Sequence, residues 1–292
     1  MAFRNVIIEN PCKCTYKGGY MVVREEDKTA KVHLSEISSV VLETNQAFMS
    51  AYLMAELAKT KISLVISDEK RNPVGQYLPL YGAHNTSKKV VEQIGWSEPA
   101  KKRVWQRVVK DKISHQASIL NARAKEEGAE RLSELIPEVR SGDATNREGV
   151  AARLYFQALF GQDFSRDQDT PLNGALNYGY AILLSAVNRE IVARGYMTQV
   201  GICHRNEYNQ FNFGCDLMEP FRPIVDRLVH DNFEGELDAY MKRILVDMLN
   251  TSVGYKDGSY RVSSVISSYV SDCLSALSKR LSVAEIQPFD VV

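Results

Sequence analysis

Four groups of polar side chains in the second half of the chain have residue types that bind metal ions or move protons. The first is centred on Glu148, which shares one face of an expected helix with Ala151, Ala152 and Tyr155, so its carboxylate should point inward. Thr145 also forms a capping box with Glu148, in which both side chains bind the start of the helix. From these residues alone, the capping role is the more economical explanation.

The second group is centred on His204, which follows Gly201 and is expected on a loop or at a helix start. The neighbouring Cys203 suggests a zinc site, but no further Cys or His lies at ligand spacing, and Cys215 is twelve residues away. A lone histidine is more often a hydrogen-bonded structural residue, and that alternative stays open.

The third group contains Asp216, Glu219 and Asp226, whose spacing of three and seven residues places them on one side of a helix. Three carboxylates on one face repel each other unless a positive charge compensates them, and Arg222 or a metal ion could supply it. Asp216 and Glu219 therefore either cap a helix or hold a cation.

The fourth group is the run NGALNYGY at residues 173–180. Its amides and tyrosines lie on an otherwise apolar helix and could make buried hydrogen bonds that position neighbouring residues. For Gly174 and Gly179, close packing between helices is the favoured explanation.

Together, these groups indicate a function more specifically than any one of them does alone. One Glu, one His and an Asp-x-x-Glu pair in a helical region suit divalent-metal chemistry on a phosphodiester, in which a metal neutralises phosphate charge and activates the attacking oxygen. Carboxylate oxygens favour Mg²⁺ or Mn²⁺, and the imidazole shifts the preference toward Mn²⁺.

The distribution of charge permits a nucleic-acid partner. The 292 residues carry 36 basic and 36 acidic side chains, yet residues 1–85, 86–125 and 126–292 have net charges of +1, +7 and −8. Because phosphates respond to local potential, the basic middle is the candidate DNA surface, although a solvated helix surface is the favoured explanation of a basic stretch taken alone. The candidate contacts are Lys88, Lys89, Lys101, Lys102, Arg103, Arg107 and Lys110, joined near the site by Arg147, Arg153 and Arg205.

The elements that must position these residues indicate an α+β fold. Residues 1–85 predict a small β-rich domain, with short strands near 5–9, 13–16, 20–24, 30–34, 38–42, 62–66 and 74–80, and one helix over 45–59. Residues 86–292 predict a larger all-α domain, with helices over 99–127, 147–159, 173–194, 217–232, 236–250 and 262–281.

Composition places the chain among globular proteins. An odd number of cysteines spread along its length argues against a disulfide framework, and no apolar run is long enough to cross a membrane. We therefore expect a cytoplasmic protein without a membrane partner.

Segments from Asn146 to Asp226 resemble the CRISPR-associated Cas1 integrase/endonuclease family of spacer acquisition. The matching segments are NREGVAARLYF at 146–156, LNGALNYGYA at 172–181, GICH at 201–204 and CDLMEPFRPIVD at 215–226. The β-rich start and GYKDGSYR at 254–261 resemble the type II branch, so the similarity extends over essentially the whole chain.

This resemblance implies a β-rich dimerisation domain and a helical catalytic domain that binds a divalent cation. Carried across by position, Glu148, His204 and Glu219 are the expected metal ligands, and Asp216 is an accessory catalytic acid. Some branches have Asp at the position of Glu219.

The implied function is a metal-dependent DNA endonuclease and integrase. A DNA 3′-hydroxyl would attack a phosphodiester at the leader–repeat junction of a CRISPR array and insert a new spacer. The implied partners are double-stranded protospacer and repeat DNA, a second copy of the chain, and Cas2, which bridges two dimers; the type II branch adds the effector nuclease Cas9 and an accessory acquisition protein. Two alternatives stay open: a non-catalytic helical DNA-binding scaffold, and a metal-dependent hydrolase of small phosphate esters.

Overall fold

The computed structural model describes residues 4–69, 71–80 and 82–292 and begins with two four-stranded sheets. The first sheet has the order β1-β5-β7-β8, in which β1, β5 and β7 are parallel and β8 is antiparallel to β7. Its strands are β1 (Arg4–Ile8), β5 (Ile37–Leu42), β7 (Ser63–Ser67) and β8 (Pro73–Tyr77).

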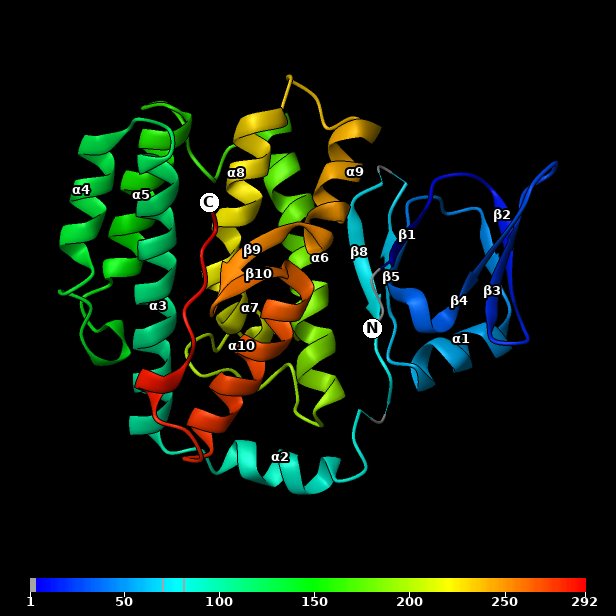
Figure 1. Ribbon diagram of the computed structural model, residues 1–292, viewed down its shortest axis with the longest axis horizontal. Helices are drawn as coiled ribbons and strands as arrows, with labels where there is room; N and C mark the ends of the chain where they lie inside the picture. Colours follow the sequence, from blue (N-terminus) through cyan, green and yellow to red (C-terminus); the bar gives the residue numbers. More distant parts are fainter. Residues whose placement is uncertain (1–3, 70, 81) are drawn as a thin grey trace.

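The second sheet has the order β4-β3-β2-β6 and lies at the outer end of the molecule (Figure 1). It consists of β2 (Cys12–Lys17), β3 (Tyr20–Arg24), β4 (Thr29–His33) and the short β6 (Ala47–Met49), followed by α1 (Ala51–Lys59). Alternate residues of β2 point to one face, so Cys12 and Cys14 are both buried in a core that also contains Leu53 and Leu57 of α1. Strand alternation therefore accounts for this Cys-x-Cys element.

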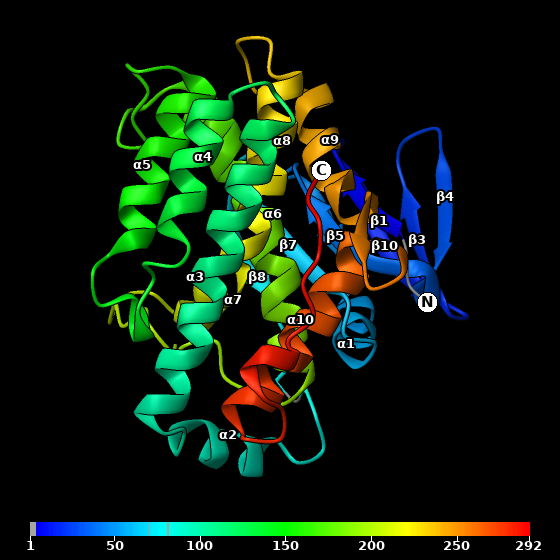
Figure 2. The same cartoon turned by 60° about the vertical axis from the view of Figure 1, so that its left-hand side comes forward.

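The rest of the chain is mostly helical. Its helices are α2 (Thr86–Ile94), α3 (Glu98–Asn121), α4 (Glu126–Leu135), α5 (Arg147–Phe160), α6 (Pro171–Ala193), α7 (Asn212–Met218), α8 (Arg222–Asn232), α9 (Ala239–Asp247) and α10 (Val262–Leu277). Short 3₁₀ turns, η1 (Leu34–Glu36), η2 (Ser141–Asp143), η3 (Glu219–Phe221), η4 (Met248–Asn250) and η5 (Val283–Glu285), complete the elements. After α10 the chain runs back along α3 (Figure 2).

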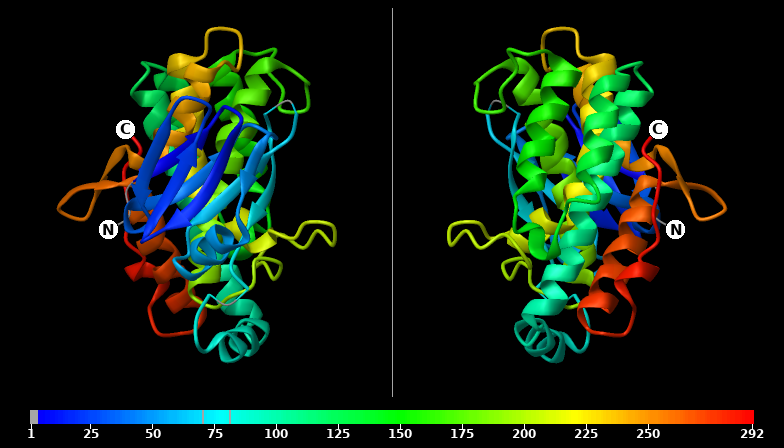
Figure 3. Two further views of the ribbon diagram at one scale, coloured as in Figure 1. Left: turned by 90° about the vertical axis from the view of Figure 1, so that its right-hand side faces the viewer. Right: turned by 90° about the vertical axis from the view of Figure 1, so that its left-hand side faces the viewer.

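An α+β fold is confirmed, but the expected all-α second part is wrong in one respect. It contains a two-stranded hairpin, β9 (Ser252–Tyr255) and β10 (Gly258–Arg261), which projects from the body (Figure 3). Each strand has only four residues, too few for a clear alternating pattern.

Two expected helices are also interrupted. The helix expected over 99–127 ends at Asn121, because Ala124 takes a left-handed backbone conformation (φ 54°), and α4 then starts anew. The helix expected over 217–232 is interrupted by the 3₁₀ turn that contains Pro220, a residue that cannot donate a backbone hydrogen bond. Asp216 lies in the helix before that turn, and Glu219 is the first residue of the turn.

The β-rich and helical parts share an interface. Helix α6 lies against β7 and β8, and α9 lies against β1 (Figure 1). Val41 and Val65 of the first sheet belong to the large apolar cluster of the helical part. The division at residue 85 therefore stays a prediction. None of the helices in the described ranges is long and apolar enough to cross a membrane.

Candidate functional site

The candidate site forms where α3, α5 and the turn between α7 and α8 meet. Lys112 of α3 lies between two of the expected ligands, and its Nζ contacts Oε1 of Glu148 and Oε2 of Glu219. The structure thus brings together two carboxylates that are 71 positions apart in the chain and aims them at one positive charge.

Glu148 is positioned by the start of α5, but not through the capping box. Asp143 accepts hydrogen bonds from the backbone N–H groups of Arg147 (2.8 Å) and Glu148 (3.0 Å), and so caps the helix itself. Asn146 precedes the helix in a left-handed conformation (φ 51°) and makes no capping bond through its side chain. The Glu148 side chain is therefore available for Lys112 instead of the helix start.

Glu219 is the most buried of the expected ligands, with 4% of its surface exposed. Its Oε1 forms an ion pair with Nε of Arg222 at 3.1 Å, so Arg222, one of the two compensating charges that the sequence suggested, does lie beside this carboxylate. Burial opposes ionisation, but the charges of Arg222 and Lys112 outweigh it and lower the pKa of Glu219. The same attraction outweighs burial at Lys112 and raises the pKa of its ammonium group.

His204 is held by Asp216. The buried Asp216 carboxylate accepts from the backbone N–H groups of Ile202, Cys203 and His204 at 2.6–3.1 Å, and lies 2.7 Å from Nδ1 of His204. The hydrogen bond to Asp216 raises the pKa of His204 although burial lowers it. Gly201 permits this loop, because a Cβ there would lie 2.6 Å from the carbonyl oxygen of His204.

The orientation of His204 leaves its other ring nitrogen for a ligand. Among the parts of the chain that the structure describes, no hydrogen bond reaches Nε2, and the ring packs edge-to-face on Trp105 of α3. A histidine that binds a metal through one ring nitrogen usually donates a hydrogen bond from the other nitrogen to a carboxylate. Burial raises the pKa of the neighbouring Cys203 thiol to about 11.

The carboxylate oxygens and the imidazole nitrogen of these residues suit a divalent cation, although the three side chains do not surround a single position in this structure. Carboxylate oxygens from Glu148 and Glu219 converge on a single cation, the Lys112 ammonium group, which marks a position of strong negative potential. As the side chains stand within residues 4–69, 71–80 and 82–292, no three His, Cys, Asp or Glu residues are close enough together to hold a metal ion.

A second layer of polar groups lies behind Glu219. The Tyr180 hydroxyl donates to Oδ1 of the buried Asp226, and the guanidinium of Arg222 lies 4.7 Å from the centre of the Tyr180 ring. Gly179 lets α6 approach α8, since a Cβ there would lie 2.4 Å from Cγ1 of Val225, as helix packing predicts. Gly174 has open space instead.

Sequence reasoning missed Lys112, Asp143 and Trp105 as site residues. Lys112 could have been found, because it follows Val108 by four residues and so falls on the apolar stripe of its helix, where a lysine is unusual. Asp143 gave no such signal, because its role depends on the left-handed turn at Asn146.

The candidate DNA-binding residues fall on several surfaces. Lys101 and Arg205 both reach Glu98, at 3.1 Å each, and Lys102 packs against Gly142 just before α5. Arg205 directly follows His204, and Gly142 directly precedes Asp143, so these three lie beside segments that carry site residues. Arg147 pairs with Glu138 at 3.0 Å, and Arg153 is exposed on α5.

The remaining candidates point elsewhere. Arg107 is bound to Asp111 at 2.7 Å and reaches the carbonyl oxygen of Val283 at 3.5 Å, and Lys110 is half-buried on the same helix. Lys88 is exposed on α2, where Lys89 contacts the Tyr196 hydroxyl at 3.1 Å.

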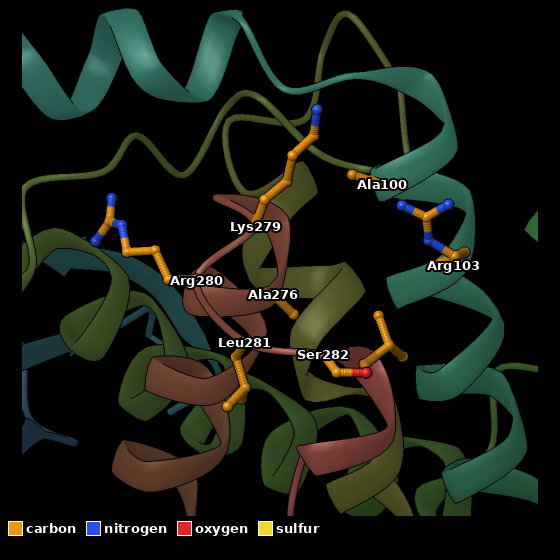
Figure 4. A pocket seen from close by; sticks show the side chains of 8 residues that line it. Ala100, Arg103, Ala276, Lys279, Arg280, Leu281 and Ser282 are labelled. Atoms are coloured by element: carbon orange, nitrogen blue, oxygen red, sulfur yellow. The ribbon is translucent and has the colours of Figure 1, made fainter.

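Arg103 lines a separate pocket with Lys279 and Arg280 (Figure 4). It is nine residues from Lys112, about two and a half helical turns, and therefore on the opposite face of α3. This basic pocket is not part of the site around Glu148.

The sequence matches a known protein family over most of its length. The family model described as CRISPR associated protein Cas1 matches residues 6–237. The "CRISPR-associated endonuclease Cas1" of Neisseria meningitidis serogroup C (strain 8013) is 34% identical over 297 residues, which covers 99% of this chain and 98% of that protein.

Solved structures share the fold. A casposase bound to an integration product aligns with a TM-score of 0.73 at 19% identity, covering 100% of this chain and 95% of that one. A chain of a Cas6-RT-Cas1–Cas2 complex aligns with a TM-score of 0.74 at 20% identity; the match covers 98% of this chain but only 36% of that longer one.

Proposed function

This chain belongs to the CRISPR-associated Cas1 family, and we propose from that membership and from the site that it is a DNA endonuclease and integrase that inserts new spacers into a CRISPR array. One observation carries the chemical part of the proposal: Glu148 and Glu219 converge on one cation beside a histidine oriented by Asp216. The relative from Neisseria meningitidis is named an endonuclease, which supports phosphodiester chemistry at this site.

The proposed cofactor is Mg²⁺ or Mn²⁺, held by Glu148, His204 and Glu219. When bound, the ion would act as a Lewis acid on the phosphodiester and lower the charge that opposes attack by the DNA 3′-hydroxyl. Asp216 fixes the imidazole through Nδ1 and so leaves Nε2 as the atom that would bind the ion. Arg222 holds the second oxygen of Glu219 and limits the positions that this carboxylate can take.

The proposed reaction is strand transfer, in which the 3′-hydroxyl bonds to phosphorus and the 3′-oxygen of the cut strand leaves. The attacking hydroxyl would lose its proton to water and the departing 3′-oxygen would take one from water, because both ring nitrogens of His204 are engaged, Nδ1 with Asp216 and Nε2 with the ion. With water in place of the 3′-hydroxyl, the same residues would cleave DNA.

We propose that DNA approaches over the site side of α3. Lys101, Lys102 and Arg205 surround the entrance and are the strongest candidates for phosphate contacts, with Arg147 and Arg153 on α5 beside them. Lys88, Lys89, Arg103, Arg107 and Lys110 are weaker candidates, because they lie on α2, on the far side of α3 or in contacts with other elements.

The proposed partners follow from the family. A structural neighbour is part of a Cas6-RT-Cas1–Cas2 complex, which supports a Cas2 partner for this chain. We further propose a homodimer formed through the β-rich part, a type II system with Cas9 and an accessory acquisition protein, and action in the prokaryotic cytoplasm.

A strand-transfer assay tests the function. It combines a DNA fragment bearing a free 3′-hydroxyl, a plasmid with a leader and repeat, Mn²⁺ and the Cas2 partner. Glu148→Gln, His204→Ala and Glu219→Gln should each lower the rate at least about 100-fold, because each removes one ligand. Glu134→Gln changes an exposed carboxylate on α4 and should leave the rate unchanged. Wild-type rates in all three site variants would refute the proposal.

A further inference from the structure

Lys112 is a buried charge that none of the proposed reaction steps uses. Only 5% of its surface is exposed, and its Nζ bridges Oε1 of Glu148 and Oε2 of Glu219. A buried ammonium group is tolerated only where anions compensate the loss of hydration, and these two carboxylates do so. The contact between Lys112 and the two carboxylates is therefore part of the packed protein interior.

The local charges are balanced in this arrangement. The carboxylates of Glu148 and Glu219 face the ammonium group of Lys112 and the guanidinium of Arg222. A divalent cation that bound the same oxygens would lie within a few Å of the Lys112 ammonium group, and like charges at that separation repel strongly in a buried site.

Lys112 and Arg222 differ in how easily their side chains can move away from the carboxylates. Arg222 is fixed by the carboxylate at Nε and by the ring of Tyr180. Lys112 carries a compact charge on a flexible four-carbon stem, so it can leave the carboxylates without moving α3.

We infer that Lys112 is a placeholder cation, which occupies the position between Glu148 and Glu219 in the metal-free protein and competes with the divalent ion for those two carboxylates. It keeps the site folded and its carboxylates paired when no metal is bound, and it lowers metal affinity so that the site does not fill at low ion concentration. This inference rests on the metal site of the proposed function.

The test compares Mn²⁺ binding by the DNA-free wild-type protein and Lys112→Met, measured by calorimetry at one pH. Methionine has a similar length and no charge, so the variant should bind Mn²⁺ at least about tenfold more tightly. Lys242→Met is the matched control, because Lys242 is buried to the same degree (6% exposed) but lies on α9 near Arg71, and it should leave Mn²⁺ affinity unchanged.

Thermal unfolding gives a second readout. In EDTA, Lys112→Met should melt at a lower temperature than the wild type, because Glu148 and Glu219 are left without their shared partner. Saturating Mn²⁺ should raise its melting temperature by more than it raises that of the wild type. If the variant is unfolded in EDTA, Mn²⁺ should restore folding.

Three results would overturn the inference. Equal or weaker Mn²⁺ binding by Lys112→Met would show that the lysine does not compete, while the metal site itself would stand. A variant that stays unfolded with and without Mn²⁺ would show that the ion cannot replace the lysine charge. Mn²⁺ binding by neither protein would remove the metal site of the proposed function and this inference with it.

Discussion

Asp226 is an ionisable residue in the layer behind the site, and its environment gives stability a definite pH dependence. Burial raises its pKa to about 6, although the hydrogen bond from Tyr180 and the charge of Arg222 oppose the shift. Because this folded-state pKa lies above the value of 3.8 for an unperturbed Asp, the folded protein binds the proton more tightly than the unfolded chain. The stability that protonated Asp226 contributes is therefore complete below about pH 4 and is lost as the pH rises through 6.

Asp226→Asn should remove this dependence. Relative to the variant, the wild type should lose up to about 3 kcal/mol of unfolding free energy between about pH 4 and pH 7. Urea unfolding at intervals across that range measures the difference. Asp231→Asn on the same helix is the control, and it should change the pH dependence of the unfolding free energy in the opposite direction. His230 and Arg123 outweigh burial there and lower the pKa of Asp231. A difference between wild type and Asp226→Asn that does not change with pH would contradict the prediction.

Individual residues show how much of the site could be predicted from the sequence. The resemblance supplied Glu148, His204, Asp216 and Glu219, and the residues themselves suggested Arg222 as the compensating charge for Glu219. The local pattern gave the wrong helix cap, because Thr145 and Glu148 have capping-box spacing whereas Asp143 makes the bonds. The partners of Lys112 lie 36 and 107 positions away, and no local pattern reports contacts at that separation.

At the scale of elements, the start of α5 determines where Glu148 lies. Asp143→Ala removes the acceptor for two backbone N–H groups, so unfolding free energy should fall by about 1 kcal/mol. Strand transfer should fall as well, because the first turn that carries Glu148 loses its anchor.

Thr145→Ala separates the two possible caps. Thr145 is exposed, and the N–H groups at the start of α5 bind Asp143 instead, so this variant should match the wild type in urea unfolding and strand transfer. A loss of stability in Thr145→Ala equal to that in Asp143→Ala would show that the capping box of Thr145 and Glu148 does stabilise the start of α5.

Helix α3 has two basic faces with different expected roles. Lys101 and Lys102 lie near the site, whereas Arg107 is bound to Asp111 and to the carbonyl oxygen of Val283. Replacing Lys101 and Lys102 together by Gln should weaken DNA binding and reduce the slope of log K against log salt by about 0.9 for each phosphate that the variant no longer neutralises.

Arg107→Gln provides the comparison. It should lower the melting temperature, because Asp111 is largely buried and loses its partner, and it should leave the salt slope of DNA binding unchanged. Fluorescence anisotropy of labelled duplex DNA at several salt concentrations measures both variants. An unchanged slope in the double variant, or a reduced one in Arg107→Gln, would reverse the roles assigned to the two faces.

Element boundaries show what local patterns can and cannot predict. Period-two and helical patterns located most strands and helices within a few residues, because burial on one face imposes those periods. They missed the helices α2 and α4, and they missed β6 and the β9–β10 hairpin, which have three or four residues per strand. They also did not register that Pro220 interrupts the helix at Glu219. Glu219, at the first position of that turn, faces Lys112, whereas Asp216, in the helix before it, faces the His204 loop.

At the scale of the whole molecule, the β-rich and helical parts are joined by polar contacts as well as apolar ones. The Tyr178 hydroxyl on α6 donates to Oε1 of the buried Glu43, and Nε2 of Gln76 donates to the carbonyl oxygen of Ser185 at 2.8 Å. Breaking this interface would expose these buried polar groups along with Val41 and Val65. The sequence alone placed a boundary at residue 85 because the periodicity changes there, but periodicity does not report which faces pack together.

We therefore predict that the first sheet and α6 unfold together. In native-state hydrogen exchange, backbone amides of β5 and β7 should exchange with the same free energy as those of α6, because separating the parts would cost the shared core. The outer sheet packs against the first sheet in a second apolar cluster, which includes Val40 and Leu64 but no residue of α6, so amides of β3 are expected to exchange at equal or lower free energy. Mass spectrometry of exchanged peptides measures all three groups. Values for β5 and β7 several kcal/mol below those of α6 would show instead that the β-rich part opens as an independent domain.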